Sequence, residues 1–151
     1  TRQATLFPYT TLFRSLQDIT VALGGRVAEE EVFDYITTGA SQDIKQATGL
    51  AKSMVTKFGM SEAVGLVNYD NDSDEVFIGR DLAHTSRGYG ESMATVIDSE
   101  VKRIIDECYS RARSIIKEHE DVLHACANLL LEKEKITREE FEALFEKRED
   151  V

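Results

Sequence analysis

The sequence predicts a mainly α-helical bundle with one short irregular or extended segment, and three observations lead to this prediction. The 151-residue chain has one proline and nine glycines, so few residues break helices. Apolar residues recur every three or four positions over most of the chain, which is the helical period. Only the stretch near residues 64–81 lacks this period. A chain of this length can form one domain with a buried core.

The first helix of the bundle is expected from Leu16 onward. Apolar side chains then recur on one helical face, at Leu16, Ile19, Leu23 and Val27. Gly24 and Gly25 interrupt this helix, and each costs about 1 kcal/mol relative to alanine. We interpret the two glycines as a place where another backbone packs closely against the helix.

A second helix is expected after a short loop that ends near Gly39. Ser41 is its predicted N-cap, and Asp43 then lies in the first helical turn. Gly59 is a typical residue just past the helix end. The predicted core-facing stripe of this helix is Ile44, Ala47, Ala51, Met54 and Val55.

Residues 64–81 are predicted to be irregular, with short extended pieces at 65–69 and 76–78. A long amphipathic helix follows over about 91–119, and a further helix covers about 121–133. Thr137 and Glu140 have the spacing of a capping box, which predicts a last helix. Its inward side chains are expected to be Phe141, Leu144 and Phe145.

The first fifteen residues are interpreted as a foreign segment. Residues 5–15 are identical, residue for residue, to the in-frame translation of a common short-read sequencing adapter. We therefore divide the chain into a foreign segment, 1–15, and a domain, 16–151, whose coding sequence would be interrupted at about Leu16. The alternative interpretation of this segment is a β-prone edge strand that contains Pro8.

Composition excludes several classes of function. The formal net charge of −10 disfavours a nucleic-acid partner, because phosphate binding needs clustered Lys and Arg. Two cysteines do not make a disulfide framework, which fits a reducing compartment. No apolar run approaches the roughly 20 residues of a spanning helix. A glycine-rich phosphate loop with Lys and Ser or Thr is absent, so ATP binding by that route is not expected.

Other candidate motifs favour ordinary structural roles. The acidic stretch at 70–81 resembles a calcium loop, but its sixth position is Glu75 and its twelfth is Asp81, where Gly and Glu are required. His119 and His124 are five residues apart, which does not copy the i, i+4 pair of a zinc helix. His84 has no paired ligand nearby in the sequence. Cys108 and Cys126 are expected to pack in the interior.

Several sequence words, in this order, resemble the FtsH family of membrane-bound, ATP-dependent zinc proteases. The resemblance covers about Leu16 to the C-terminus. The words are Leu23-Gly24-Gly25-Arg26, Ala28-Glu29-Glu30, Thr37 to Asp43, Met54 to Ser61, Val76 to Arg80, and Ile97-Asp98-x-Glu100-Val101.

The resemblance implies that Asp43 is the third zinc ligand of a peptidase site. The family's other two ligands and its catalytic Glu come from a His-Glu-x-x-His helix, and this sequence contains no such motif. No catalytic residue and no cofactor-binding residue is therefore assigned in this chain, and the fragment itself is expected to hold no zinc and to be inactive, because one carboxylate cannot retain the metal.

For the intact protein the resemblance implies an ATP-dependent zinc metalloendopeptidase that degrades membrane and soluble proteins. It implies an ATPase domain that binds ATP and Mg, a homo-hexamer, and a membrane anchor with this domain on the cytoplasmic side, all supplied by segments absent here. The fragment is expected to be soluble. The alternative function is a non-catalytic helical interaction or adaptor module, since amphipathic helices alone fit either.

Overall fold

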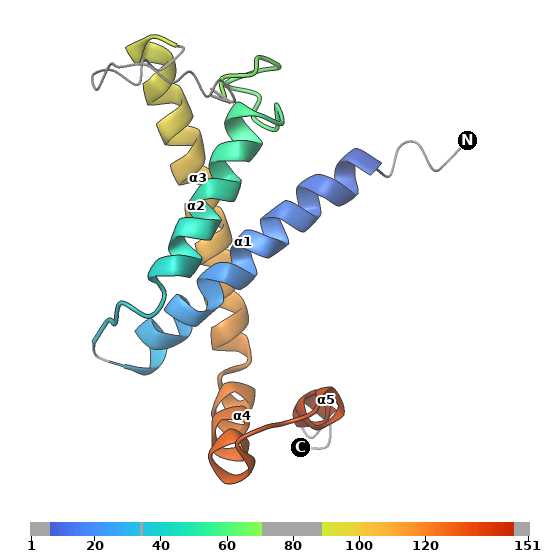
Figure 1. Cartoon of the computed structure of the whole chain (residues 1–151). Helices are drawn as coiled ribbons and strands as arrows, with labels where there is room; N and C mark the ends of the chain where they lie inside the picture. Colours follow the sequence, from blue (N-terminus) through green and yellow to red (C-terminus); the bar gives the residue numbers. More distant parts are fainter. Residues whose placement is uncertain (1–6, 34, 71–88, 147–151) are drawn as a thin grey trace, which may run out of the picture.

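The computed structural model describes residues 7–33, 35–70 and 89–146, and within these ranges the chain is built from five helices and contains no strand. The helices are α1 (Phe7–Val32), α2 (Ser41–Thr56), α3 (Glu91–Glu118), α4 (Glu120–Lys133) and α5 (Arg138–Glu146). The prediction of a mainly α fold is confirmed. α1, α2 and α3 pack against one another, while α4 and α5 lie beyond the C-terminal end of α3 (Figure 1).

The core lies where α1, α2 and α3 meet. The predicted stripes of α1 and α2 and the apolar face of α3 supply it, and each contributes side chains that are almost fully buried. Ile44 is an exception in the α2 stripe, because 41% of it is exposed beside the open start of the helix. The buried core residues include Ile19, Leu23, Val27, Ala47, Ala51, Met54, Val55, Ile97, Ile104 and Cys108.

α1 begins at Phe7, nine residues before the expected start, and includes residues 7–15 of the segment interpreted as foreign. The edge-strand alternative is therefore wrong for the described residues 7–15. Pro8 lies in the first turn, where a missing N–H breaks no helical hydrogen bond. Leu12 packs against the core and Ser15 is buried. The assignment of residues 1–15 to a foreign origin stays a prediction, because a helix says nothing of where its coding sequence came from.

The segment after α2 is irregular as far as it is described. The extended piece expected at 65–69 is not a strand, and the piece expected at 76–78 lies outside the described residues. Gly59 and Gly65 adopt left-handed backbone conformations, with φ of 62° and 79°. The Tyr69 N–H bonds to the Thr56 carbonyl at 2.8 Å, so this segment folds back on the end of α2.

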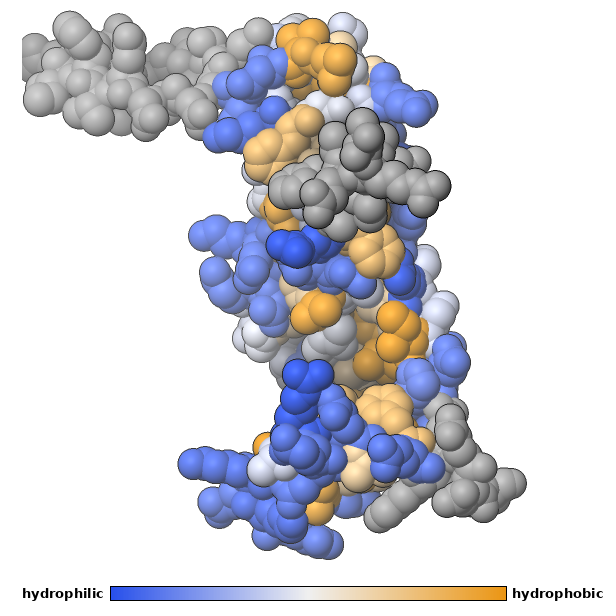
Figure 2. All heavy atoms as spheres, turned by 90° about the vertical axis from the view of Figure 1, so that its right-hand side faces the viewer, coloured by the Kyte–Doolittle hydropathy of each residue, from blue (hydrophilic) through white to orange (hydrophobic). Residues whose placement is uncertain are grey.

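α4 and α5 form a hairpin joined by the predicted capping box. The Glu140 N–H bonds to Thr137 Oγ1 at 3.2 Å, and the Thr137 N–H bonds to Glu140 Oε2 at 2.9 Å. The inward placement of Phe141 is wrong, because 41% of it is exposed and no residue of α5 is buried. This nine-residue helix contacts α4 and the C-terminal end of α3 on one side only, so its aromatic residues are incompletely covered. Figure 2 shows apolar side chains at the surface in separate groups along the molecule.

Candidate functional site

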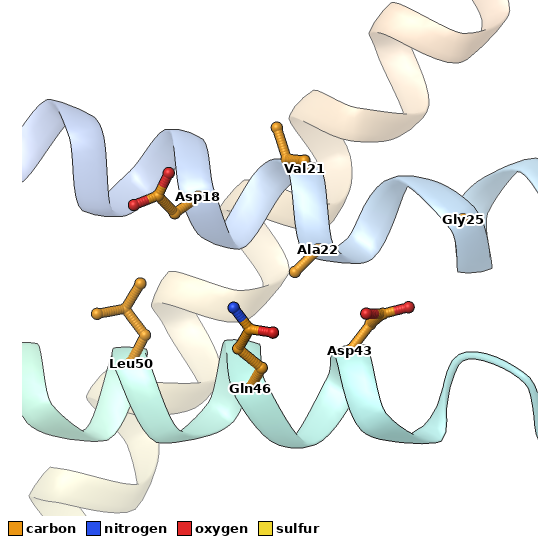
Figure 3. Close-up of a pocket in the computed structure, with 7 residues that line it drawn as sticks. All are labelled: Asp18, Val21, Ala22, Gly25, Asp43, Gln46 and Leu50. Carbon is orange, nitrogen blue, oxygen red and sulfur yellow. The ribbon is translucent and has the colours of Figure 1, made fainter.

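A cleft lies between α1 and α2, and Asp43 forms part of its wall. Its volume is about 370 Å³. Figure 3 shows the side chains of Asp43, Gln46 and Leu50 pointing from α2 toward α1. From the other side the cleft is bounded by Asp18, Val21, Ala22 and Gly25 of α1. The cleft is therefore open on one side to solvent and carries carboxylates from both helices.

Asp43 lies in the first turn of α2, as predicted, and is exposed. The prediction that Ser41 caps this helix is wrong. Ala40 is the N-cap and Ser41 is the first helical residue. The Ser41 N–H already bonds to the Thr38 carbonyl at 3.0 Å, so the chain turns before Ser41 can act as a cap. An acidic residue in a first helical turn has the favourable orientation relative to the helix dipole.

Open space surrounds the two glycines of α1 that were predicted to contact another backbone. A Cβ atom placed on Gly24 or Gly25 would meet nothing within 4 Å in the described part of the chain. The prediction of a close backbone neighbour is therefore not met by any described residue. On the α1 side of the cleft, opposite Asp43, the surface is a glycine without a side chain (Figure 3).

The loop before α2 is held by polar side chains at the C-terminal end of α1. Thr37 Oγ1 donates to Glu29 Oε1 at 2.6 Å, and the Gly39 N–H donates to Thr37 Oγ1 at 3.2 Å. Arg26 donates through NH1 to the Thr37 carbonyl at 3.3 Å and through Nε to Glu30 Oε1 at 2.8 Å. These hydrogen bonds were not predicted from the sequence, although Arg26, Glu29 and Glu30 lie at polar positions of a helix whose other face is in the core.

Asp43 has no companion ligands in the described part of the chain. No group of three His, Cys, Asp or Glu side chains there could hold a metal ion. His119 packs edge to face on Phe145 with ring centroids 5.3 Å apart, and His124 Nε2 lies 3.8 Å from Glu120 Oε1. Both are at the α3–α4 junction, away from the cleft. His84, Asp81 and Glu75 lie outside the described residues.

Cys108 packs in the core as expected. Its thiol is 3.5 Å from the Leu16 carbonyl, and burial raises the pKa of the Cys108 thiol above its usual value. A thiol held in its neutral form is a poor nucleophile. Cys126 is partly buried and lines an apolar pocket between the C-terminal end of α3, α4 and α5.

Comparison with known proteins identifies the family. A model of the family described as Peptidase family M41 matches residues 9–144. The chain belongs to peptidase family M41. The match begins inside the segment assigned to a foreign origin, so the boundary at Leu16 remains a prediction.

Three relatives have names that specify zinc and ATP. The chain is 49% identical over 138 residues to "ATP-dependent zinc metalloprotease FtsH" of Ruminiclostridium cellulolyticum, which covers 91% of this chain and 22% of that protein. It is 50% identical over 137 residues to "ATP-dependent zinc metalloprotease FtsH 1" of Thermoanaerobacter sp., with coverage of 91% and 22%. It is 50% identical over 125 residues to "ATP-dependent zinc metalloprotease FtsH 2" of Methylacidiphilum infernorum, with coverage of 83% and 19%.

The M41 chain spans about a fifth of the length of these relatives. A search of its described helices for one long and apolar enough to cross a membrane finds none.

Proposed function

We propose that this chain is the part of an ATP-dependent zinc metalloendopeptidase that supplies Asp43 as one ligand of the catalytic zinc. The observation that carries the proposal is the position of Asp43, exposed in the first turn of α2 and facing a cleft across from Gly25. The printed names of the relatives support zinc as the metal. A carboxylate is an ordinary zinc ligand in catalytic sites.

The residues present fit one part of such a site. Among the described residues, no hydrogen bond or ion pair occupies the Asp43 carboxylate, and the cleft beside it is open. A catalytic zinc takes three protein ligands and keeps a further position for water. This sequence contains no His-Glu-x-x-His motif. We infer from the family resemblance that the intact protein would supply two histidines and a general-base glutamate from such a helix.

In such a site the metal and the side chains of this protein would have different chemical roles. Zinc in such a site lowers the pKa of bound water toward 7 and polarises the peptide carbonyl. Asp43 would hold one side of the metal from the first turn of α2, where the helix dipole favours a negatively charged side chain. The α1 surface at Ala22 and Gly25 carries no bulky side chain, so it leaves room for a helix that brings the remaining ligands.

We further propose the properties of the intact protein from the family resemblance. It would carry an ATPase domain that binds ATP and Mg, assemble as a homo-hexamer, and act on membrane and soluble protein substrates. A membrane anchor outside this sequence would place the peptidase domain on the cytoplasmic side.

A chimeric protease tests the proposal. The FtsH of Ruminiclostridium cellulolyticum would carry residues 16–151 of this chain in place of its own matching segment. Zinc affinity is measured by chelator competition and casein hydrolysis by fluorescence. Mutation of a residue that only orients a metal ligand typically lowers metal affinity by roughly 10- to 100-fold. We therefore expect Asp43→Ala to weaken zinc binding by more than about 100-fold and to abolish hydrolysis.

Asp18→Ala is the matched control, because Asp18 lines the same cleft from α1. We expect it to leave zinc affinity within about twofold, since α1 supplies no ligand in this proposal. Equal zinc affinity in the Asp43→Ala and unsubstituted chimeras would refute Asp43 as a ligand.

A further inference from the structure

The start of α2 has few attachments to the rest of the molecule. From Val32 to Gly39 every described residue is exposed, including the apolar side chains of Phe33, Tyr35 and Ile36. Ala40, 6% exposed, is the first residue of the loop to be buried. Apolar burial therefore fixes the helix only from Ala40 onward, and the direction in which the chain enters the helix must be set by polar contacts.

These polar contacts come from three side chains that we call the loop-holding cluster: Arg26, Glu29 and Thr37. Arg26 reaches the Thr37 carbonyl, and Glu29 accepts the Thr37 hydroxyl hydrogen at 2.6 Å. The same hydroxyl oxygen accepts the Gly39 N–H. Thr37 is thus held through both its backbone and its side chain. Its hydroxyl in turn holds the N–H of Gly39, the residue before Ala40.

The cluster is itself oriented by α3. Arg26 bonds to Glu30 Oε1 at 2.8 Å, and the other oxygen of Glu30 accepts the phenolic hydrogen of Tyr109. Arg26 also lies 3.9 Å from Glu29 Oε2, an oxygen that is buried and otherwise unpartnered among the described residues. A charged pair with little exposed surface has few alternative arrangements, so the cluster presents a fixed surface to the loop.

We propose that the loop-holding cluster positions Asp43 for metal binding, with Thr37 as the main positioning residue. The inference rests on the proposed function, since it assumes that Asp43 is a zinc ligand. Asp43 follows Gly39 by four positions, and the hydrogen bonds from Ser41 to Thr38 and from Ile44 to Ala40 span this part of the chain. A shift at Thr37 therefore moves the first turn of α2, and with it the Asp43 carboxylate. Small displacements of a ligand are costly because zinc distances and angles are narrowly defined.

Hydrogen exchange in this chain tests the restraint without metal or activity. Thr37→Val removes the hydroxyl and keeps the side-chain shape. We expect the amides of Gly39, Ser41 and Ile44 to exchange about five to ten times faster, because a lost bond of ordinary strength shifts the local opening equilibrium by that factor. Thr48→Val is the matched control, since Thr48 is exposed on α2 and bonds only to the Ile44 carbonyl of its own helix.

Zinc affinity in the chimeric protease tests the consequence. We expect Thr37→Val to weaken zinc binding about tenfold, the lower end of the effect of residues that orient a ligand. Thr37→Ser retains the hydroxyl and should recover most of the affinity, while Thr48→Val should change nothing. With saturating zinc, kcat for casein should fall with KM unchanged, because the metal geometry is altered and substrate contacts are not.

The outcomes separate this inference from the proposed function. If Asp43→Ala weakens zinc binding while Thr37→Val and Thr48→Val bind zinc equally well, the positioning role is refuted and the ligand role stands. If Asp43→Ala binds zinc as tightly as the unsubstituted chimera, both are refuted. Unchanged exchange at Gly39 and Ser41 in Thr37→Val would refute the positioning role whatever the metal data show.

Discussion

Tyr109 of α3 donates its phenolic hydrogen to Glu30 of α1, and this bond joins residues 79 positions apart in the sequence. The bond to Tyr109 and the contact with Arg26 hold the pKa of Glu30 below its usual value. The same bond raises the pKa of Tyr109. A single contact therefore joins α1 and α3, which pack against each other, and orients the arginine that reaches the loop before α2.

We expect Tyr109→Phe to lower the free energy of unfolding by about 1–2 kcal/mol. The change removes a hydrogen bond to a charged group, while Glu30 keeps its bond to Arg26. Urea denaturation at pH 7 measures the effect. Tyr69→Phe is the control, because the Tyr69 ring packs edge to face on Tyr89 and the substitution preserves that contact. A loss no larger than that of Tyr69→Phe would contradict the prediction.

The stability difference between the unsubstituted chain and Tyr109→Phe should depend on pH at both ends of the range. Folding lowers the pKa of Glu30, so its contribution is present above the unfolded value of 4.5 and is lost as pH falls through the folded pKa. Folding raises the pKa of Tyr109, so its contribution is present below 10.0 and is lost as pH rises through the folded pKa.

Urea denaturation of both proteins from pH 3 to pH 11 checks this expectation. The difference should form a plateau between about pH 5 and pH 9 and shrink on either side. If the stability difference between the two proteins were constant over the whole pH range, the Tyr109–Glu30 bond would not depend on the protonation of either side chain.

The parts of the fold that could be predicted from sequence are those set by local signals. The long helix was placed within a residue of its observed bounds, because its apolar period is continuous from Ile97 to Ala112. The capping box at Thr137 was found because both partners lie three residues apart. Asp43 was placed in a first helical turn, and its proposed role came from a family resemblance that no local pattern supplies.

The parts that could not be predicted depend on contacts between distant residues. The bonds of Glu29 to Thr37 and of Glu30 to Tyr109 have no periodic signature, because polar side chains on a helix are ordinarily solvated. Ser41 was misplaced as the N-cap because the turn from Thr38 begins earlier than the residue types suggest. Phe141 was expected in the core because the sequence does not reveal how much of α5 is covered.

Ser61 offers a second test of a long-range polar contact. It is 2% exposed, and its hydroxyl donates to Glu100 Oε2 of α3 at 2.6 Å. The pKa of Glu100 is lowered by its hydrogen bond to Arg103 and, to a smaller extent, by Ser61. We expect Ser61→Ala to lower the free energy of unfolding by about 1–2 kcal/mol, measured by urea denaturation, because a buried partner of a carboxylate is lost.

Ser99→Ala is the matched control for Ser61→Ala. Ser99 is adjacent to Glu100, is exposed, and bonds only to the Val96 carbonyl of its own helix at 2.8 Å. Its removal should change stability by less than about 0.5 kcal/mol. If both variants lost the same free energy of unfolding, the Ser61–Glu100 hydrogen bond would contribute no more than the exposed Ser99 hydroxyl does.

Alanine substitution should change the free energy of unfolding in opposite directions at Gly59 and at Gly25. Gly59 has φ of 62°, and an added Cβ would lie 3.1 Å from Leu66 Cδ2. Leu66 is 93% exposed and can move away, so the cost of Gly59→Ala comes from the left-handed backbone, about 1–2 kcal/mol. Gly25 lies inside α1, and a Cβ there meets nothing within 4 Å among the described residues.

Gly25→Ala should therefore raise the free energy of unfolding of this chain, by about 1 kcal/mol, because alanine loses less backbone entropy in a helix. Thermal and urea denaturation of Gly25→Ala and Gly59→Ala, measured side by side, check both signs. A destabilised Gly25→Ala chain would show that the cleft beside Asp43 has no room for a methyl group. That result would also remove the open α1 surface on which the proposed approach of a second zinc-binding helix depends.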